Sequence, residues 1–94
     1  MEIADKAKER TIYSLKRTEG QIRGIQKMIS ESRDCIDVLN QVDAAIGALS
    51  RIEDNILHNL IRPCIEDILK EKKRAEREEK LIELLELIRR LRKI

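Results

Sequence analysis

The stretch that decides the fold is residues 35–64, CIDVLNQVDAAIGALSRIEDNILHNLIRPC, which begins and ends with the only two cysteines of the chain. Steps of three and four residues from Cys35 meet an almost unbroken apolar row, and this period is typical of an amphipathic helix rather than a strand. Before reaching Cys64, the row passes through Leu39, Val42, Ile46, Leu49, Glu53, Ile56 and Leu60. The sequence therefore predicts one long helix with both thiols on its apolar seam.

The spacing of the two cysteines points to a site shared between subunits. In a straight helix the 29 residues from Cys35 to Cys64 span roughly 43 Å, so the two thiols cannot meet within one subunit. Two copies packed antiparallel about a two-fold axis would place Cys35 of one subunit beside Cys64 of the other, with Leu39 opposite Leu60. A site built from one cysteine of each subunit is the resulting hypothesis.

Length and composition favour a small helical subunit that assembles with copies of itself. The 94 residues make one domain at most, with Tyr13 as the only aromatic residue and 40% charged residues. No apolar run approaches the ~20 residues that span a bilayer, and the N-terminal sequence lacks the apolar core of a signal peptide. We expect a cytoplasmic protein with no membrane partner. In a reducing compartment, two cysteines indicate metal or redox chemistry, with two inert buried thiols as the alternative.

Charge is distributed unevenly along the chain. Residues 1–27 contain seven Lys/Arg and four Asp/Glu, residues 28–61 contain two and six, and residues 62–94 contain eleven and eight. The segment balances are +3, −4 and +3, which add to the net charge of +2. A basic N-terminal helix beside an acidic central one offers a surface that could face phosphate groups.

Apolar periodicity also predicts the first helix, over about residues 4–29. Its expected inner face consists of Leu15, Ile22, Ile25 and Ile29, with Ile12 and Met28 beside it. Gly20 and Gly24 lie four residues apart on one side of this helix, where each costs about 1 kcal/mol relative to alanine. Close approach of another helix would compensate for that cost.

Two breaks define the remaining helix boundaries. Ser30, Ser32 and Asp34 are all competent N-cap residues, so the second helix should begin among them, immediately before Cys35. Proline is tolerated in the first turn of a helix and disfavours helix in the residue before it, so Pro63 should open the third helix. The sequence therefore predicts a single domain, residues 1–94, with an extended C-terminal helix over about residues 66–94. Both thiols would then lie at helix starts, where unpaired amides favour a thiolate.

The sequence argues against an enzyme. It contains no glycine-rich phosphate loop, no Ser/His/Asp set and no paired carboxylates in a plausible cleft. His58 is the only histidine, and two distant cysteines with one imidazole do not match the closely spaced four-ligand set of a structural zinc site.

Three segments resemble the CsoR/RcnR family of bacterial transcriptional repressors: LKRTEGQIRGIQKMI at 15–29, DVLNQVDAAIGAL at 37–49 and HNLIRPC at 58–64. The resemblance covers residues 12–69 without a gap. It implies an all-α fold with a three-helix subunit, an antiparallel dimer with a four-helix-bundle core, and a dimer of dimers that binds operator DNA. It also implies that ligand binding at the thiols releases the DNA, and that basic faces carry the DNA contact instead of a helix-turn-helix.

Departures from the family pattern bear on the inducer. Copper-sensing members carry a histidine four residues before the second cysteine, where this chain has Leu60. His58 lies two residues before Leu60 and about 200° from it round the helix, so its ring would not point to the same side. Members that keep both cysteines and lack this histidine resemble the persulfide-sensing, CstR-like branch, in which reactive sulfur species link the two thiols across subunits. Asp34 and Lys80 replace a tyrosine and a glutamate that are typical of copper sensors, and both changes argue against copper.

The resemblance also implies which cations meet DNA. A first-helix arginine typical of the DNA-binding face is Ser14 here. The candidate DNA-binding residues are therefore Lys16, Arg17, Arg23 and Arg51.

The sequence-based hypothesis is a transcriptional repressor that releases operator DNA when persulfide or polysulfide modifies or cross-links Cys35 and Cys64 of neighbouring subunits. It needs no cofactor. The alternative within the family is a Cu(I) sensor that binds the metal through the same two thiolates. The alternative from another class is a helical oligomeric scaffold without DNA binding.

Overall fold

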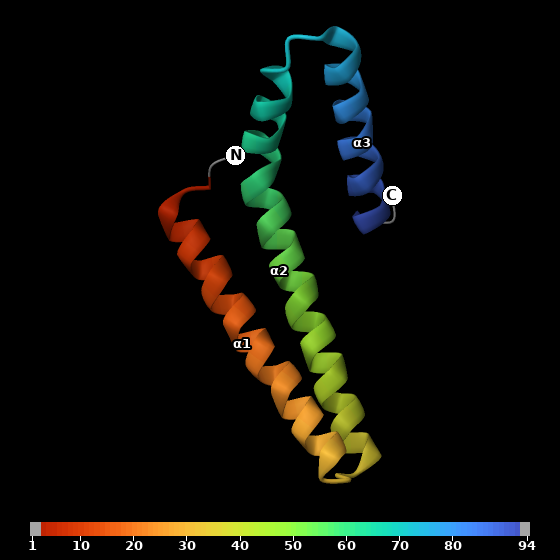
Figure 1. The fold of residues 1–94 in the computed structure, drawn as a ribbon. Coiled ribbons are helices and arrows are strands. Elements are labelled where there is room, and N and C mark those ends of the chain that lie inside the picture. Colours follow the sequence, from red (N-terminus) through yellow and green to blue (C-terminus); the bar gives the residue numbers. More distant parts are fainter. Residues whose placement is uncertain (1–2, 93–94) are drawn as a thin grey trace. The chain divides into compact units, whose positions relative to one another are not determined.

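The computed structural model describes residues 3–92, which form three helices and no strand (Figure 1). The helices are α1 (Asp5–Ser30), α2 (Cys35–Leu69) and α3 (Arg74–Arg92). The predicted all-α, three-helix chain is confirmed, and the first helix lies within one residue of its expected bounds. Contacts divide the chain into two compact units, one of residues 3–59 and the other containing residues 60–92. Among the described residues, no helix combines the length and apolarity needed to cross a membrane.

The end of the second helix differs from the prediction. Pro63 does not open the third helix: it lies inside α2, which continues to Leu69, so the predicted C-terminal helix over about residues 66–94 is wrong in its start. That helix begins at Arg74, and residues 93 and 94 lie outside the described chain. A proline inside a helix costs about 3 kcal/mol because it removes a backbone hydrogen bond and crowds the preceding turn. Half-buried apolar side chains on both sides of Pro63, among them Ile61, Ile65 and Ile68, favour helix strongly enough to offset that cost.

The same proline removes one backbone hydrogen bond from α2. A helical residue donates its amide to the carbonyl four residues earlier, and Pro63 has no amide hydrogen to offer the Asn59 carbonyl. The two compact units divide between Asn59 and Leu60.

A short turn joins α1 to α2. The amide of Arg33 donates to the Met28 carbonyl (2.9 Å) and the amide of Ser32 to the Ile29 carbonyl (3.1 Å), the bond pattern that closes many helix C-termini. Ser32 occupies the left-handed position at φ 56°, which glycine usually fills. Asp34 then caps α2, because its carboxylate accepts the Ile36 amide at 3.2 Å. Of the three candidate caps, the chain uses Asp34.

In the unit of residues 3–59, α1 and the first part of α2 lie side by side and antiparallel (Figure 1). The buried residues of the described chain are Ala7, Thr18, Ala45 and Ile52, and only the last has a large side chain. The α1 face that meets α2 follows a seven-residue pattern of mostly small or polar side chains, namely Ala7, Thr11, Ser14, Thr18, Gln21, Ile25 and Met28. The hydroxyls of Thr11 and Thr18 donate to the Ala7 and Ser14 carbonyls of their own helix at 2.8 and 3.1 Å.

The predicted inner face of α1 is therefore wrong in large part. Ile25 is half-buried as expected, but Leu15, Ile22 and Ile29 are exposed, Ile29 by 63%. Hydrophobic periodicity correctly located an apolar stripe on α1. This stripe does not pack against α2 of the same chain. Periodicity shows that a stripe needs covering and does not show which element covers it.

The predicted seam of α2 also faces outward over much of its length. Leu39 and Ile46 are 64% and 61% exposed, and Leu49 is exposed as well. Large apolar side chains exposed in rows on two neighbouring helices are typical of a surface that another protein chain covers. The pairing of this seam with a second copy stays a prediction.

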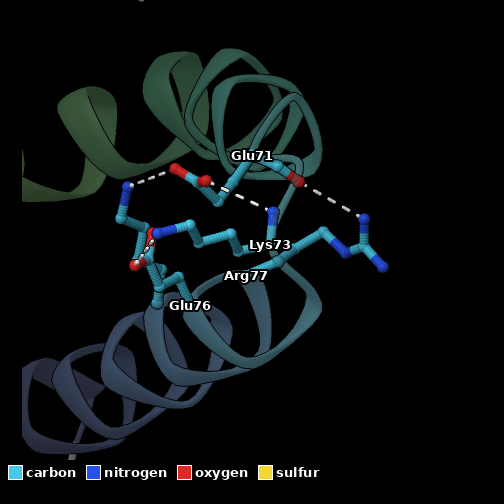
Figure 2. Close-up of polar contacts among 5 residues, drawn as sticks. Glu71, Lys73, Glu76 and Arg77 are labelled. Carbon is cyan, nitrogen blue, oxygen red and sulfur yellow. Dashed lines mark hydrogen bonds and ion pairs between the residues drawn. The ribbon is translucent and has the colours of Figure 1, made fainter.

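In the second unit, α3 folds back beside the end of α2 (Figure 1). Its half-buried positions are spaced by four, three and four residues: Arg77, Leu81, Leu84 and Ile88. Figure 2 shows the turn that starts this hairpin, where the Glu71 carboxylate accepts the Lys73 amide at 3.4 Å. Lys80 lies 3.4 Å from the other carboxylate oxygen, and the Arg77 guanidinium donates to the Glu71 carbonyl at 3.3 Å. Glu71 thus connects the turn to the first two turns of α3.

We expect the hairpin to loosen in acid through Glu71. The Lys73 amide, helped by the Lys80 ammonium, lowers the pKa of Glu71 below its ordinary value. A carboxyl with a lowered folded-state pKa contributes stability above its unfolded value, and that contribution is lost as the pH falls through the folded one. NMR titration of the Glu71 carboxyl should show this lowered pKa, and Lys80→Ala should raise it. Lys72→Ala removes the same charge from the turn without that ion pair, so an equal rise in this control would contradict the contact as the cause.

Candidate functional site

The two thiols occupy different environments. Both cysteines are free. Cys35 is exposed and is the first residue of α2, as predicted, so it lies at a helix start where unpaired amides stabilise negative charge. Cys64 is half-buried and lies inside α2, so the prediction that it also starts a helix is wrong. Only Cys35 combines an exposed side chain with a helix start.

Two carboxylates lie near Cys35 in the sequence. Asp34 caps the helix immediately before it, and Asp37 lies in the first turn of α2.

The side chains near Cys64 in the sequence do not complete a metal site within one chain. Leu60, one turn before Cys64, is half-buried and carries no donor atom. Across residues 3–92, no three His, Cys, Asp or Glu side chains are grouped so that they could hold a metal ion. The donors of this chain fit a soft metal bound by thiolates alone, and they do not fit a site that needs a histidine at position 60.

A cleft between α1 and α2 brings two of the predicted DNA-binding residues together. Arg17 from α1 and Arg51 from α2 line a cleft of about 230 Å³, which we call the first cleft. The Arg51 guanidinium passes close to Gly47, where an added Cβ would lie 3.7 Å from Nη1. The remaining lining is mostly polar: Ser14, Thr18, Gln21, Ala48, Ile52 and Asn55. Two guanidinium groups flanked by hydroxyl and amide groups suit a phosphate ligand.

A second cleft of about 640 Å³ continues the first along the same two helices. Ser14, Ile52 and Asn55 line both clefts, which together form what we call the α1–α2 groove. Arg10, Tyr13 and His58 are the new functional groups of the second cleft, and Glu9 supplies its carboxylate. No sequence pattern predicted a site at Arg10 or Tyr13, and none predicted a role for His58.

Lys16 and Arg23, the other predicted DNA-binding residues, do not line the groove. Both are exposed on α1, and the Arg23 guanidinium pairs with the Glu19 carboxylate at 3.5 Å. The helical period explains the difference, because Lys16 lies about 100° round α1 from Arg17. The structure thus places Arg17 and Arg51 together and leaves Lys16 and Arg23 on a neighbouring face.

The two glycines of α1 have no close neighbour in the described chain. A Cβ added at Gly20 or Gly24 would meet nothing within 4 Å. The expected close approach of another helix is therefore not made within this chain. Both glycines are exposed.

Comparison with known proteins identifies a family of the same fold. Residues 7–90 match the family described as metal-sensitive transcriptional repressors. The copper-sensing transcriptional repressor CsoR of Bacillus subtilis is 32% identical over 90 residues, which are 96% of this chain and 86% of that protein. The copper-sensing transcriptional repressor RicR of Mycobacterium tuberculosis is 45% identical over 51 residues, 54% of this chain and 53% of that protein.

Two solved structures resemble most of the chain. The crystal structure of the copper-sensing repressor CsoR with Cu(I) from Geobacillus thermodenitrificans has a TM-score of 0.75 and 31% identity, with 96% of this chain and 91% of that one covered. The nickel-responsive transcriptional regulator InrS has a TM-score of 0.63 and 36% identity, covering 88% and 90% of the two chains.

We expect Cys35 to react several-fold faster than Cys64 with a small alkylating reagent at neutral pH, because Cys35 is exposed at a helix start. Peptide mass spectrometry of quenched time points measures both rates in one sample. Asp34→Asn keeps a capping oxygen, so Cys35 should remain the faster thiol in this variant. Faster reaction of Cys64 in the wild type would contradict the assignment of Cys35 as the nucleophile.

Proposed function

Because the chain belongs to the family of metal-sensitive transcriptional repressors, we propose that it binds operator DNA through the α1–α2 groove and releases it when Cys35 and Cys64 are modified. The observation that carries this proposal is the combination, on one two-helix unit, of a cationic groove at Arg17 and Arg51 with an exposed thiol at the start of α2. The family consists of repressors and not of enzymes, so the thiols are sensors in this proposal. A cytoplasmic location follows from the same role.

The proposed assembly is a homotetramer built from antiparallel dimers. The outward-facing apolar rows of α1 and α2 give each subunit a surface for a second copy, and covering them would complete a four-helix bundle. Antiparallel pairing of α2 places Cys35 of one subunit beside Cys64 of its partner. A dimer of such dimers repeats the α1–α2 groove four times, which suits a long duplex.

The proposed inducer is a sulfane-sulfur compound such as inorganic polysulfide. The Cys35 thiolate attacks a sulfur atom of the polysulfide, and a shorter polysulfide leaves with the electron pair of the broken S–S bond. The Cys64 thiolate of the neighbouring subunit then attacks the Cys35 sulfur of this persulfide. A disulfide forms and hydrosulfide leaves, so two thiols are oxidised and one sulfur atom is reduced. Leu60 supports this inducer, since it supplies no metal ligand beside Cys64.

Cu(I) is the second candidate inducer, favoured by a specific finding: two of the similar proteins are copper-sensing repressors and a third was solved with Cu(I). Two thiolates are soft ligands that satisfy Cu(I) in a linear arrangement. In that case Cys35 and Cys64 of neighbouring subunits would bind the ion, with no contribution from position 60. Family membership favours either repressor over a scaffold without DNA binding.

The groove residues should control DNA affinity. Arg17→Ala and Arg51→Ala should each weaken binding to a duplex selected from a random-sequence pool and reduce the slope of log K against log salt by about 0.9, the loss of one phosphate contact. Lys16→Ala and Arg23→Ala, on the neighbouring face, should weaken binding less. Arg62→Ala, in the other compact unit, is the charge-matched control. Light scattering should show the same assembly for all variants, and unchanged affinity for both groove variants would rule out this surface.

The thiols should form a covalent link between subunits. Polysulfide should convert the wild type to a dimer on a denaturing gel without reductant and release the same duplex, and Cys35→Ala or Cys64→Ala should abolish both effects. Intact-protein mass spectrometry distinguishes a disulfide from a link with extra sulfur. If Cu(I) releases the duplex and polysulfide has no effect, the copper alternative is correct and the sulfur chemistry is excluded.

A further inference from the structure

The α1–α2 groove has a second pair of nitrogen-bearing side chains seven residues along both helices from Arg17 and Arg51. Arg10 lies seven residues before Arg17 on α1, and His58 lies seven residues after Arg51 on α2. Because the helices run antiparallel, these two shifts go in the same direction along the groove. Seven residues are two helical turns, so Arg10 and His58 occupy nearly the same angular positions as Arg17 and Arg51, roughly 10 Å further on.

The lining between these two pairs is continuous and polar. Ser14 and Asn55 line both clefts and lie between the pairs on their respective helices. Tyr13, 65% exposed, adds a phenol to the second cleft beside Arg10 and His58. The Asn59 side chain donates to the Asn55 carbonyl at 2.8 Å, which fixes the side of the cleft formed by α2. Hydrogen-bond donors therefore extend along the groove beyond Arg17 and Arg51.

We propose that the second cleft, at Arg10, Tyr13 and His58, is a further contact for the phosphate backbone of the same DNA duplex. This inference rests on the proposed DNA-binding function and extends its surface by one repeat. Arg10 supplies the charge, while the Tyr13 hydroxyl and the His58 ring supply hydrogen bonds to phosphate oxygens. A separation of roughly 10 Å is about three base-pair rises along one strand, so backbone phosphates recur within reach of both pairs.

The charges of this cleft make the proposal specific. Glu9 lines the second cleft and its carboxylate opposes a phosphate, whereas the first cleft has no carboxylate among its lining residues. Removing Arg10 and removing Glu9 should therefore change DNA affinity in opposite directions. Lys8 is also exposed on α1 and lines neither cleft, so it provides a matched control.

The experiment measures binding of the full-length protein to a mixed-sequence 40-base-pair duplex over a series of salt concentrations. A phosphate contact is independent of sequence, so this probe suffices. Arg10→Ala should weaken binding and reduce the salt slope by about 0.9, and Arg10→Lys should restore the slope. Glu9→Gln should strengthen binding, His58→Arg should increase the salt slope, and Lys8→Ala should change neither quantity.

Two results would separate the inference from the function on which it rests. If the wild type does not bind duplex DNA, the proposed function itself fails. If the wild type binds and Arg17→Ala weakens binding while Arg10→Ala and Glu9→Gln match Lys8→Ala, only the second cleft is excluded. An Arg10→Ala loss that Arg10→Lys does not restore would show a packing role and would also overturn the proposal. Saturable NMR shifts at His58 with inorganic phosphate, unaltered by duplex, would identify a small-anion site instead.

Discussion

The α1 side chains that meet α2 are mostly small or polar, and the rest of this subunit depends on that constraint. Ala7, Thr18 and Ala45 let the two helices lie against each other while burying little apolar area. The larger apolar side chains of both helices are consequently directed outward, where a second chain can cover them. The same two helices also form the α1–α2 groove, whose lining includes hydroxyl and amide groups. One choice of side-chain size thus shapes both the assembly surface and the ligand surface.

The long second helix connects the two roles proposed for the protein. Its first part carries Cys35 and Arg51 in one compact unit, and its last part carries Cys64 in the other. Modification of a thiol and contact with phosphate therefore involve one helix, which makes it the candidate two-state element that a sensor requires. Within the last part of this helix, Pro63 removes one backbone hydrogen bond.

The sequence predicted the local features well and the relations between elements less well. The bounds of α1 and the helix start at Cys35 follow from apolar period and capping residues, which act over a few neighbours. The end of α2 was missed because apolar continuity over residues 61–68 outweighs the local effect of Pro63. The stripe at Leu15, Ile22 and Ile29 was found but assigned to the wrong neighbour, since no one-chain pattern distinguishes an intramolecular from an intermolecular face.

The candidate site shows the same division. Resemblance identified Arg17 and Arg51, and the structure brings them together, while Lys16 and Arg23 fall outside the groove. The sequence contained one indication of a site at Arg10 and His58: each lies seven residues from an arginine of the pair Arg17 and Arg51. That signal has meaning only once α1 and α2 are known to be antiparallel neighbours in a particular register, and apolar periodicity had favoured a different inner face for α1.

The scarcity of buried apolar side chains has a consequence for the folding and degradation of newly made chains. In the described chain only Ala7, Ala45 and Ile52 are buried apolar residues, and a single subunit cannot offset its conformational entropy with so small a core. In the proposed assembly, where a second copy covers the apolar rows, folding and association would be one event, and the folded fraction would rise with the concentration of chains. Newly made subunits that have not met a partner would be open to cellular proteases, whereas assembled ones would persist. Turnover would then remove isolated chains selectively and make the number of working repressors a steep function of the rate of synthesis.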